Sequence, residues 1–238
     1  MFHLAFGQTV YDVLLVVYAA LVMPALSARN GRKLSPDAPL APRYLRMMLR
    51  GWLAAAATAA LWTFTKRPPA ALGLDIPLGA GGMIGLAIAC AVLVVAIVVQ
   101  LLLPRLMTPQ RRERLRGQMR AIKILPRSTV ELLLFLGVSL TAGVWEELVY
   151  RGFLFWFIAP YAGIAGAVVL STLVFGIGHV YQGWRGALNA SVLGLLFAIG
   201  YALSRSLWWL MLIHALVDAF GGLVAWRVLR MPDNGRAK

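Results

Sequence analysis

The sequence predicts an all-α, polytopic transmembrane helix bundle of about seven to eight spans, with an intramembrane active-site cavity. Of its 238 residues, 61% are hydrophobic and only 13% are charged. The apolar residues form long blocks, and a membrane span needs about 20 such residues. The net charge of +14 collects between these blocks, which is typical of cytoplasmic loops and predicts no nucleic-acid partner.

The N-terminal region, residues 1–128, carries no motif and is predicted to hold three spans. They cover residues 10–26, 49–65 and 83–103. The first should end near Pro24 and the third at Pro104, because proline disrupts a continuing helix.

Basic or turn-rich links separate these three spans. A proline-interrupted basic loop that includes Arg43, Arg46 and Arg50 precedes the second span, and a turn-rich link covers residues 66–82. The link over residues 104–128 is the most basic, and we expect either an amphipathic helix on the membrane surface or a solvated loop.

The C-terminal region, residues 129–230, is predicted to hold four spans, followed by a short basic tail at 231–238. The four cover residues 129–158, 164–179, 188–203 and 207–229, and the first of them should end at Pro160. Placing the basic links and tail on the cytoplasmic side gives seven spans in a multi-pass protein. The composition favours a bacterial cytoplasmic (inner) membrane, with anionic lipid headgroups as counter-ions.

Six ionisable residues stand inside or beside the apolar blocks of this C-terminal region. Such groups cost several kcal/mol at membrane depth unless they are paired or hydrated, so each is a candidate functional residue. The six are Glu146, Glu147, Arg151, His179, His214 and Asp218.

The first group, Glu146-Glu147-x-x-x-Arg151, predicts both an ion pair and a catalytic acid or base. Glu147 and Arg151 share a helix face, in the favourable order for a pair that stabilises the helix. Glu146 points about 100° away and lacks that partner. An unpaired carboxylate in a dry cavity suits a general base, which makes Glu146 the strongest catalytic candidate.

Two further pairs bring imidazoles to the predicted site. Phe175 and His179 share one helix face, and Gly176 and Gly178 beside the histidine permit close approach of a neighbouring backbone. His214 and Asp218 share a face of the last span, where the aspartate could fix the tautomer of the histidine, ligate a metal or hold a water.

Taken singly, these groups could also serve a structural or a transport role. A buried ion pair could simply hold the bundle together, and a chain of ionisable residues could relay protons in a transporter. The hydropathy pattern shows no inverted repeat, which argues against a transporter. Counting along the spans puts Glu146 near mid-membrane and His214 nearer the outer face, so a shared site requires a broken, tilted or re-entrant span.

The three groups together resemble the CAAX prenyl protease and bacteriocin-processing family of intramembrane proteases. The order EExxxR, FxxxH and HxxxD matches over residues 129–229. The resemblance implies a membrane-embedded endopeptidase in which Glu146 and His179 activate a water, with His214 and Asp218 binding the oxyanion. Glu147, Arg151 and Phe175 would support the site.

Asp218 departs from the pattern of the prenyl-protein endopeptidases, which have asparagine there. An ionised aspartate cannot donate to an oxyanion, so it would be protonated, act through His214 or bind a metal. Zn²⁺ or another divalent ion on Glu146, His179, His214 and Asp218 and a metal-free Glu–His pair both fit the residues.

The predicted partners are membrane lipids and a membrane-associated peptide or protein substrate. The alternative function within the same fold is a non-catalytic bacteriocin self-immunity or membrane scaffold protein. That role would not need Glu146 and both histidines together.

Overall fold

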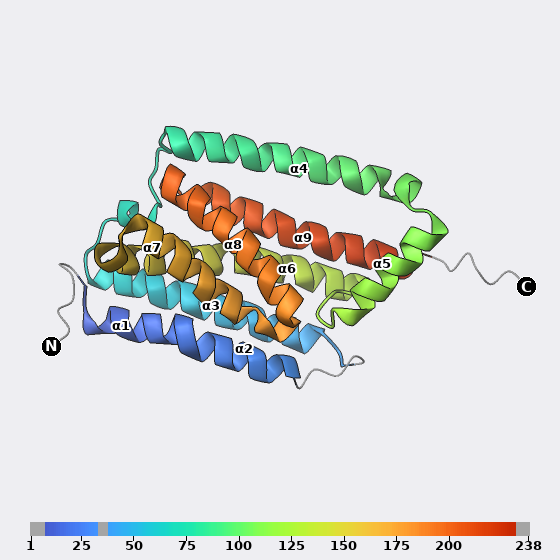
Figure 1. Ribbon diagram of the computed structural model, residues 1–238, viewed down its shortest axis with the longest axis horizontal. Helices are drawn as coiled ribbons and strands as arrows, with labels where there is room; N and C mark the ends of the chain where they lie inside the picture. The colour runs from blue at the N-terminus through green and yellow to red at the C-terminus, as the bar shows by residue number, and fades with distance from the viewer. Residues whose placement is uncertain (1–7, 33–37, 232–238) are drawn as a thin grey trace, which may run out of the picture.

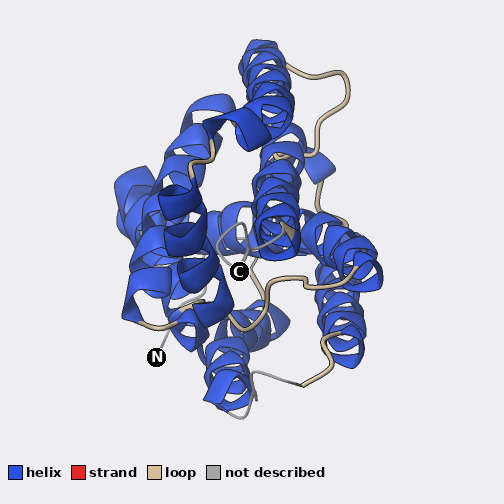
Figure 2. Ribbon diagram, turned by 90° about the vertical axis from the view of Figure 1, so that its right-hand side faces the viewer, coloured by secondary structure: helices blue, strands red, loops and turns tan. Residues whose placement is uncertain are grey.

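The computed structural model describes residues 8–32 and 38–231. Within these ranges the chain is built of helices and loops without a strand (Figures 1 and 2), which confirms the predicted all-α class. The helical elements, in chain order, are α1 (Val10–Val17), η1 (Tyr18–Val22), α2 (Met23–Arg32), α3 (Ala41–Phe64), η2 (Pro69–Leu72), α4 (Ala80–Leu106), α5 (Pro109–Ala121), α6 (Thr129–Glu146), η3 (Glu147–Leu154), α7 (Phe155–Gly178), η4 (Val180–Gln182), α8 (Trp184–Ser204) and α9 (Trp208–Arg230).

Helix α6 lies at the centre of the bundle, where it packs against both α3 and α9. In Figure 1, α4 runs along one edge beside α9, and α1 and α2 run along the opposite edge. Helices α7 and α8 pack against each other on one side of this layer. Every residue of the predicted site therefore comes from α6, α9, the π-helix η3 that follows α6, or α7 and the residue at its end.

Five helical segments of the described chain are long and apolar enough to cross a membrane, judged by length and composition. They are Val10–Arg29, Ala80–Leu103, Thr129–Gly178, Trp184–Ser204 and Trp208–Arg230. Helix α3 is not among them, and Thr129–Gly178 counts as one segment of 50 residues. The predicted integral, multi-pass membrane character is supported, whereas the count of seven or eight spans is not confirmed.

The predicted ends at Pro24 and Pro160 are wrong. Helix α2 continues past Pro24 to Arg32. The third span ends at Leu103, beside Pro104 as predicted, although helix α4 itself runs to Leu106. Pro160 lies inside α7, and the chain leaves helical geometry at Gly163 instead, with φ 68° and ψ 178°. A proline removes only one hydrogen bond, so a helix can continue past it. A positive φ interrupts the helix, and glycine adopts it readily because it has no side chain.

Two basic segments contain helix: one was expected to be a loop, and for the other a helix and a loop were both expected possibilities. The very basic link forms α5, which packs on α9 and so agrees with a helix rather than a solvated loop. Helix α3 starts at Ala41, with Pro42 in its first turn, where the missing N–H costs nothing. Arg43, Arg46 and Arg50 consequently lie on a helix instead of on the predicted loop.

Two glycines let helices that carry site residues approach closely. A Cβ on Gly143 of α6 would lie 2.6 Å from the main-chain oxygen of Met211 on α9. A Cβ on Gly176 of α7 would lie 2.0 Å from Ser191 Oγ on α8, so the close neighbour is a side chain, whereas the predicted neighbouring backbone is represented by Ala187 O at 3.6 Å. Gly178 has no comparably close neighbour, since its nearest atom would be Tyr150 Oη at 3.6 Å.

Candidate active site

A buried network of charged side chains connects η3, α8 and α9. Arg151 Nη1 donates to Glu147 Oε1 at 3.0 Å, so the predicted ion pair is present, and both side chains are almost fully buried. Arg151 Nη2 donates to the main-chain oxygen of Gly194 at 3.1 Å. The same Glu147 oxygen accepts a hydrogen bond from His214 Nδ1 at 2.7 Å. Glu147 therefore joins the first motif to the third.

His214 is oriented by Glu147 rather than by Asp218. Because Nδ1 is bonded to Glu147, the other ring nitrogen, Nε2, faces Glu146 Oε2 and Asp218 Oδ2, each at 3.8 Å. The 3.8 Å contacts are too long for hydrogen bonds. The Asp218 side chain is also 41% exposed, so it lies beside His214 at the border of the buried network.

Glu146 has a buried carboxylate oxygen without a hydrogen-bond partner. Oε2 is inaccessible to solvent and bonds to no group of the described chain, and its closest charged neighbour is His214 Nε2. A buried carboxylate oxygen left unpaired costs free energy, so such an atom is expected to face a substrate, a proton or a water. As expected, Glu147 pairs with Arg151, whereas Glu146 has no arginine partner among the described residues.

Phe175 separates the two imidazoles and supports Arg151. Its ring centroid lies 4.6 Å from that of His179 and 6.2 Å from that of His214. The Arg151 guanidinium carbon stands 4.2 Å from the Phe175 ring centroid, a cation–π contact. The ring is buried, so its bulk fixes the spacing of all three polar groups.

His179 sits at the C-terminal end of α7, with its ring held by the helix. Nδ1–H donates to the main-chain oxygen of Phe175 at 2.8 Å, and because a carbonyl only accepts, this bond places the proton on Nδ1. The lone pair of neutral His179 is then on Nε2. Burial lowers the pKa of His179 below its usual 6.5, which favours the neutral imidazole.

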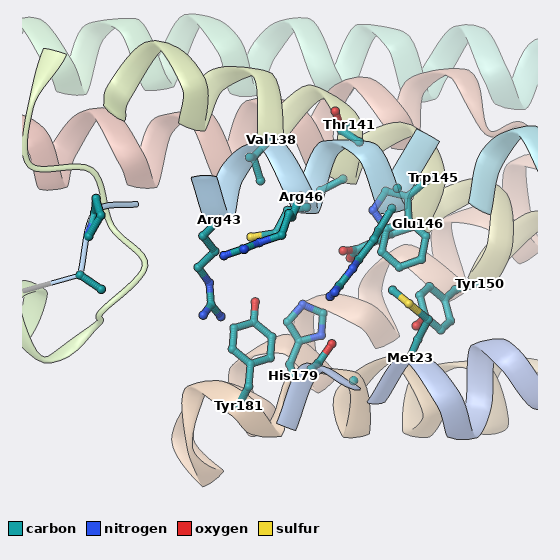
Figure 3. A pocket seen from close by; sticks show the side chains of 18 residues that line it. Met23, Arg43, Arg46, Val138, Thr141, Trp145, Glu146, Tyr150, His179 and Tyr181 are labelled. Atoms are coloured by element: carbon teal, nitrogen blue, oxygen red, sulfur yellow. The ribbon is translucent and has the colours of Figure 1, made fainter. Parts of the chain in front are cut away.

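Glu146 and His179 line one cavity of about 460 Å³. Figure 3 shows their side chains reaching into this space, Glu146 from α6 and His179 from the end of α7. His214 and Asp218 are not among the lining residues, and His214 contacts the site through Glu146 and Glu147. The remaining walls come from α2, the residues just before α3, α3 itself, α6, η3 and the segment that follows α7.

The cavity contains residues that the sequence did not single out as part of the site. Trp145, Tyr150 and Tyr181 line it, as do the three arginines of α3. Burial raises the pKa of Tyr181 to about 12, so its phenol keeps its proton. The helical spacing of the arginines was visible in the sequence, but the prolines before them favoured a loop.

The described residues do not gather into a metal site. Within residues 8–32 and 38–231, no group of three or more His, Cys, Asp or Glu side chains is placed to hold a metal ion. His214 Nδ1 is already hydrogen-bonded to Glu147, and Asp218 Oδ2 lies 3.8 Å from His214 Nε2. A metal on these residues therefore stays a prediction.

A family model described as type II CAAX prenyl endopeptidase, Rce1-like, matches residues 128–220. No curated protein and no solved structure matches the chain. The matched segment contains every predicted site residue from Glu146 to Asp218, and the family is described as one of endopeptidases. Residues 128–220 of this multi-pass membrane protein are thus similar to the type II CAAX prenyl endopeptidases, which supports the family resemblance that the motifs predict.

Proposed function

We propose that this protein is a membrane-embedded endopeptidase that hydrolyses a peptide bond in a membrane-associated peptide or protein, in the cytoplasmic membrane of a bacterium. The observation that carries the proposal is the pairing in one cavity of an unpartnered carboxylate, Glu146, with an imidazole, His179, whose free lone pair is on Nε2. This is the combination that activates a water for attack on a carbonyl carbon.

In the first step, Glu146 accepts a proton from a water that His179 Nε2 also holds. The water oxygen forms a bond to the peptide carbonyl carbon, and the carbonyl oxygen becomes an oxyanion. Two groups that point at one water restrict its orientation, which lowers the entropic part of the barrier.

We expect His214 to stabilise the charge that develops on this oxyanion. Glu147 fixes the ring by accepting from Nδ1, so a proton on Nε2 would make that atom a donor directed toward Glu146, which lines the cavity. Asp218, 3.8 Å from Nε2, supports the protonated ring electrostatically and need not donate itself. The C–N bond then breaks as Glu146 returns its proton to the leaving amine.

The experiment that tests this function compares protein termini in native membranes by mass spectrometry. Membranes with the wild-type chain are compared with membranes that contain Glu146→Gln, which keeps the size of the side chain and removes its basicity. Glu113→Gln is the matched control, because Glu113 is exposed on α5, outside the cavity. New termini are expected with the wild type and the control, but not with Glu146→Gln.

These termini would also identify the substrate and the cleaved bond. If the three proteins are equally abundant and folded, and their termini do not differ, the endopeptidase proposal is wrong. A binding role in the same fold, such as self-immunity or scaffolding, would then explain the structure better.

A further inference from the structure

The hydroxyl group of Tyr150 has no hydrogen-bond partner in the part of the chain that the structure describes. Tyr150 belongs to η3 and is only 3% exposed, yet it lines the same cavity as Glu146 and His179. A buried hydroxyl costs free energy unless it is hydrogen-bonded. This one is therefore expected to meet a water or a substrate group in the cavity.

Tyr150 extends from the helix of Glu146 to the end of the helix that carries His179. It follows Glu146 by four residues in a continuous helix, so the two side chains share one face. Its Oη reaches the end of α7, where a Cβ on Gly178 would lie 3.6 Å from it. Gly178 immediately precedes His179. Figure 3 shows Tyr150 at the end of the cavity where Glu146 lies, and Tyr181 at the other end.

Aromatic packing fixes the ring of Tyr150 in this position. Its centroid lies 5.3 Å from that of Phe175 in a T-shaped contact, and 6.0 Å from that of Trp145. Phe175 also contacts the ring of His179, so one buried side chain sets the spacing of both polar groups. A hydroxyl that is held in place before the reaction needs little reorganisation to act in the transition state.

The reacting carbonyl needs a hydrogen-bond donor that Glu146 and His179 do not supply. In the proposed step Glu146 accepts a proton and neutral His179 offers the lone pair of Nε2, so neither donates to the oxyanion as it forms. His214 is not among the residues that line the cavity. A phenol holds its proton at neutral pH, and Tyr150 therefore offers a neutral donor inside the cavity.

Two other donors near Glu146 are directed elsewhere. Thr141 Oγ1 donates to the main-chain oxygen of Gly137 at 2.8 Å. Trp145 Nε1 faces α3, where a Cβ on Gly51 would lie 2.9 Å from it. On the helix that carries Glu146, the hydroxyl of Tyr150 is thus the donor best placed for the reacting carbonyl.

We propose that Tyr150 is a further catalytic residue, whose hydroxyl donates a hydrogen bond to the carbonyl oxygen of the scissile peptide bond as that oxygen becomes an oxyanion. The hydroxyl keeps its proton throughout, so the bonds that form and break are those of the proposed hydrolysis. The inference rests on the proposed function, because it takes the cavity as the peptide site. An oxyanion accepts a hydrogen bond more strongly than a neutral carbonyl does, so this contact acts mainly in the transition state.

The test removes the hydroxyl alone. Tyr150→Phe keeps the ring against Phe175 and loses no hydrogen bond within the described chain, so the variant should unfold at the wild-type temperature. Each purified protein is placed in phosphatidylcholine vesicles, and kcat and KM are measured with a synthetic peptide that spans the bond found by the terminus comparison. We expect kcat to fall about 100-fold in Tyr150→Phe, with KM little changed.

Two further variants separate this role from other effects of losing a phenol. Tyr201→Phe is the matched control, because Tyr201 is also 3% exposed and packs T-shaped on Phe155, but does not line the cavity. It should keep the wild-type kcat. Tyr181→Phe tests the competing phenol of the cavity, whose Oη accepts from Gln182 Nε2 at 3.0 Å and so has its own proton available.

A second peptide tests the contact with the carbonyl oxygen itself. In this peptide sulfur replaces the scissile carbonyl oxygen, and sulfur is a weaker hydrogen-bond acceptor. If the hydroxyl of Tyr150 contacts that atom, the ratio of the wild-type kcat to the Tyr150→Phe kcat should fall from about 100 to below about 10.

Several results would overturn the inference. They are an unchanged kcat in Tyr150→Phe, a change in KM alone, a loss that is the same with the sulfur peptide, an equal loss in Tyr201→Phe, a larger loss in Tyr181→Phe, and unfolding of Tyr150→Phe, which would indicate a structural hydroxyl. Failure of the proposed function looks different, because the wild type itself would then not cleave the peptide. If the inference alone fails, wild-type cleavage remains.

Discussion

Gly143 holds the helix of Glu146 against the helix of His214, and replacing it by alanine should separate the two. A Cβ at this position would lie 2.6 Å from the main-chain oxygen of Met211 and 2.9 Å from the main-chain nitrogen of Ala215. Backbone atoms cannot rotate away as a flexible side chain would. Restoring an ordinary contact of 3.4 Å at Met211 therefore requires α6 and α9 to move apart by about 0.8 Å.

That displacement is enough to break the orientation of His214. The hydrogen bond from His214 Nδ1 to Glu147 would lengthen from 2.7 Å to about 3.5 Å, beyond hydrogen-bond range. Misplacement of a catalytic group by about 1 Å can cost roughly 100-fold in rate. We expect a loss of that order in cleavage and a fall of about 1–3 kcal/mol in the free energy of unfolding.

The assay measures the rate of cleavage at termini that depend on Glu146, together with thermal unfolding of the purified protein. Gly221→Ala is the matched control, because Gly221 is on α9 and a Cβ there would meet no atom within 4 Å. The control should keep its activity and be as stable as the wild type or slightly more so. If Gly143→Ala cleaves and unfolds like the wild type, Gly143 does not set the distance between α6 and α9.

Three further predictions concern the N-terminal ion pair, pH and metal. Asp12→Asn should lower the free energy of unfolding by about 3–5 kcal/mol, seen in thermal unfolding, because it leaves Arg67 without the buried carboxylate that now binds both guanidinium nitrogens at 2.7 Å. Cleavage should fall in acid as the pH drops through the lowered pKa of His179, because protonation removes the lone pair on Nε2. A profile that rises in acid would contradict that role. Because the proposed step uses only Glu146 and His179 to activate the water, incubation with a chelator should leave cleavage intact, whereas a loss that Zn²⁺ restores would contradict that step.

Local contacts of the site could be predicted from the sequence, whereas contacts between distant segments could not. The pairing of Glu147 with Arg151 follows from helical periodicity alone. The bond between Glu147 and His214 joins residues 67 positions apart. This bond depends on the close packing of α6 against α9. The only sign of that packing in the sequence is the glycine at position 143. Counting along the spans separated Glu146 from His214 for the same reason, and the structure brings them to 3.8 Å.

Proline was the least reliable guide along this chain. A span was expected to end just before Pro160, but the helix continues and the chain departs from helical geometry at Gly163. The prolines before α3 suggested a loop, although Pro42 occupies the first turn, where a helix tolerates it. Because this segment was expected to be a loop, its three arginines were not included in the predicted site. Their spacing at positions 43, 46 and 50 was the available signal, since it places all three on one helix face.

The most direct test of the central claim uses the purified chain in phosphatidylcholine vesicles, with no other membrane protein, and the substrate identified from the terminus comparison. If Glu146 and His179 activate the water, the wild type alone should cleave this substrate. Folded Glu146→Gln should be slower by at least about 100-fold. If the purified wild type does not cleave, or if Glu146→Gln cleaves at the wild-type rate, the protein is not an endopeptidase that uses Glu146 as its base.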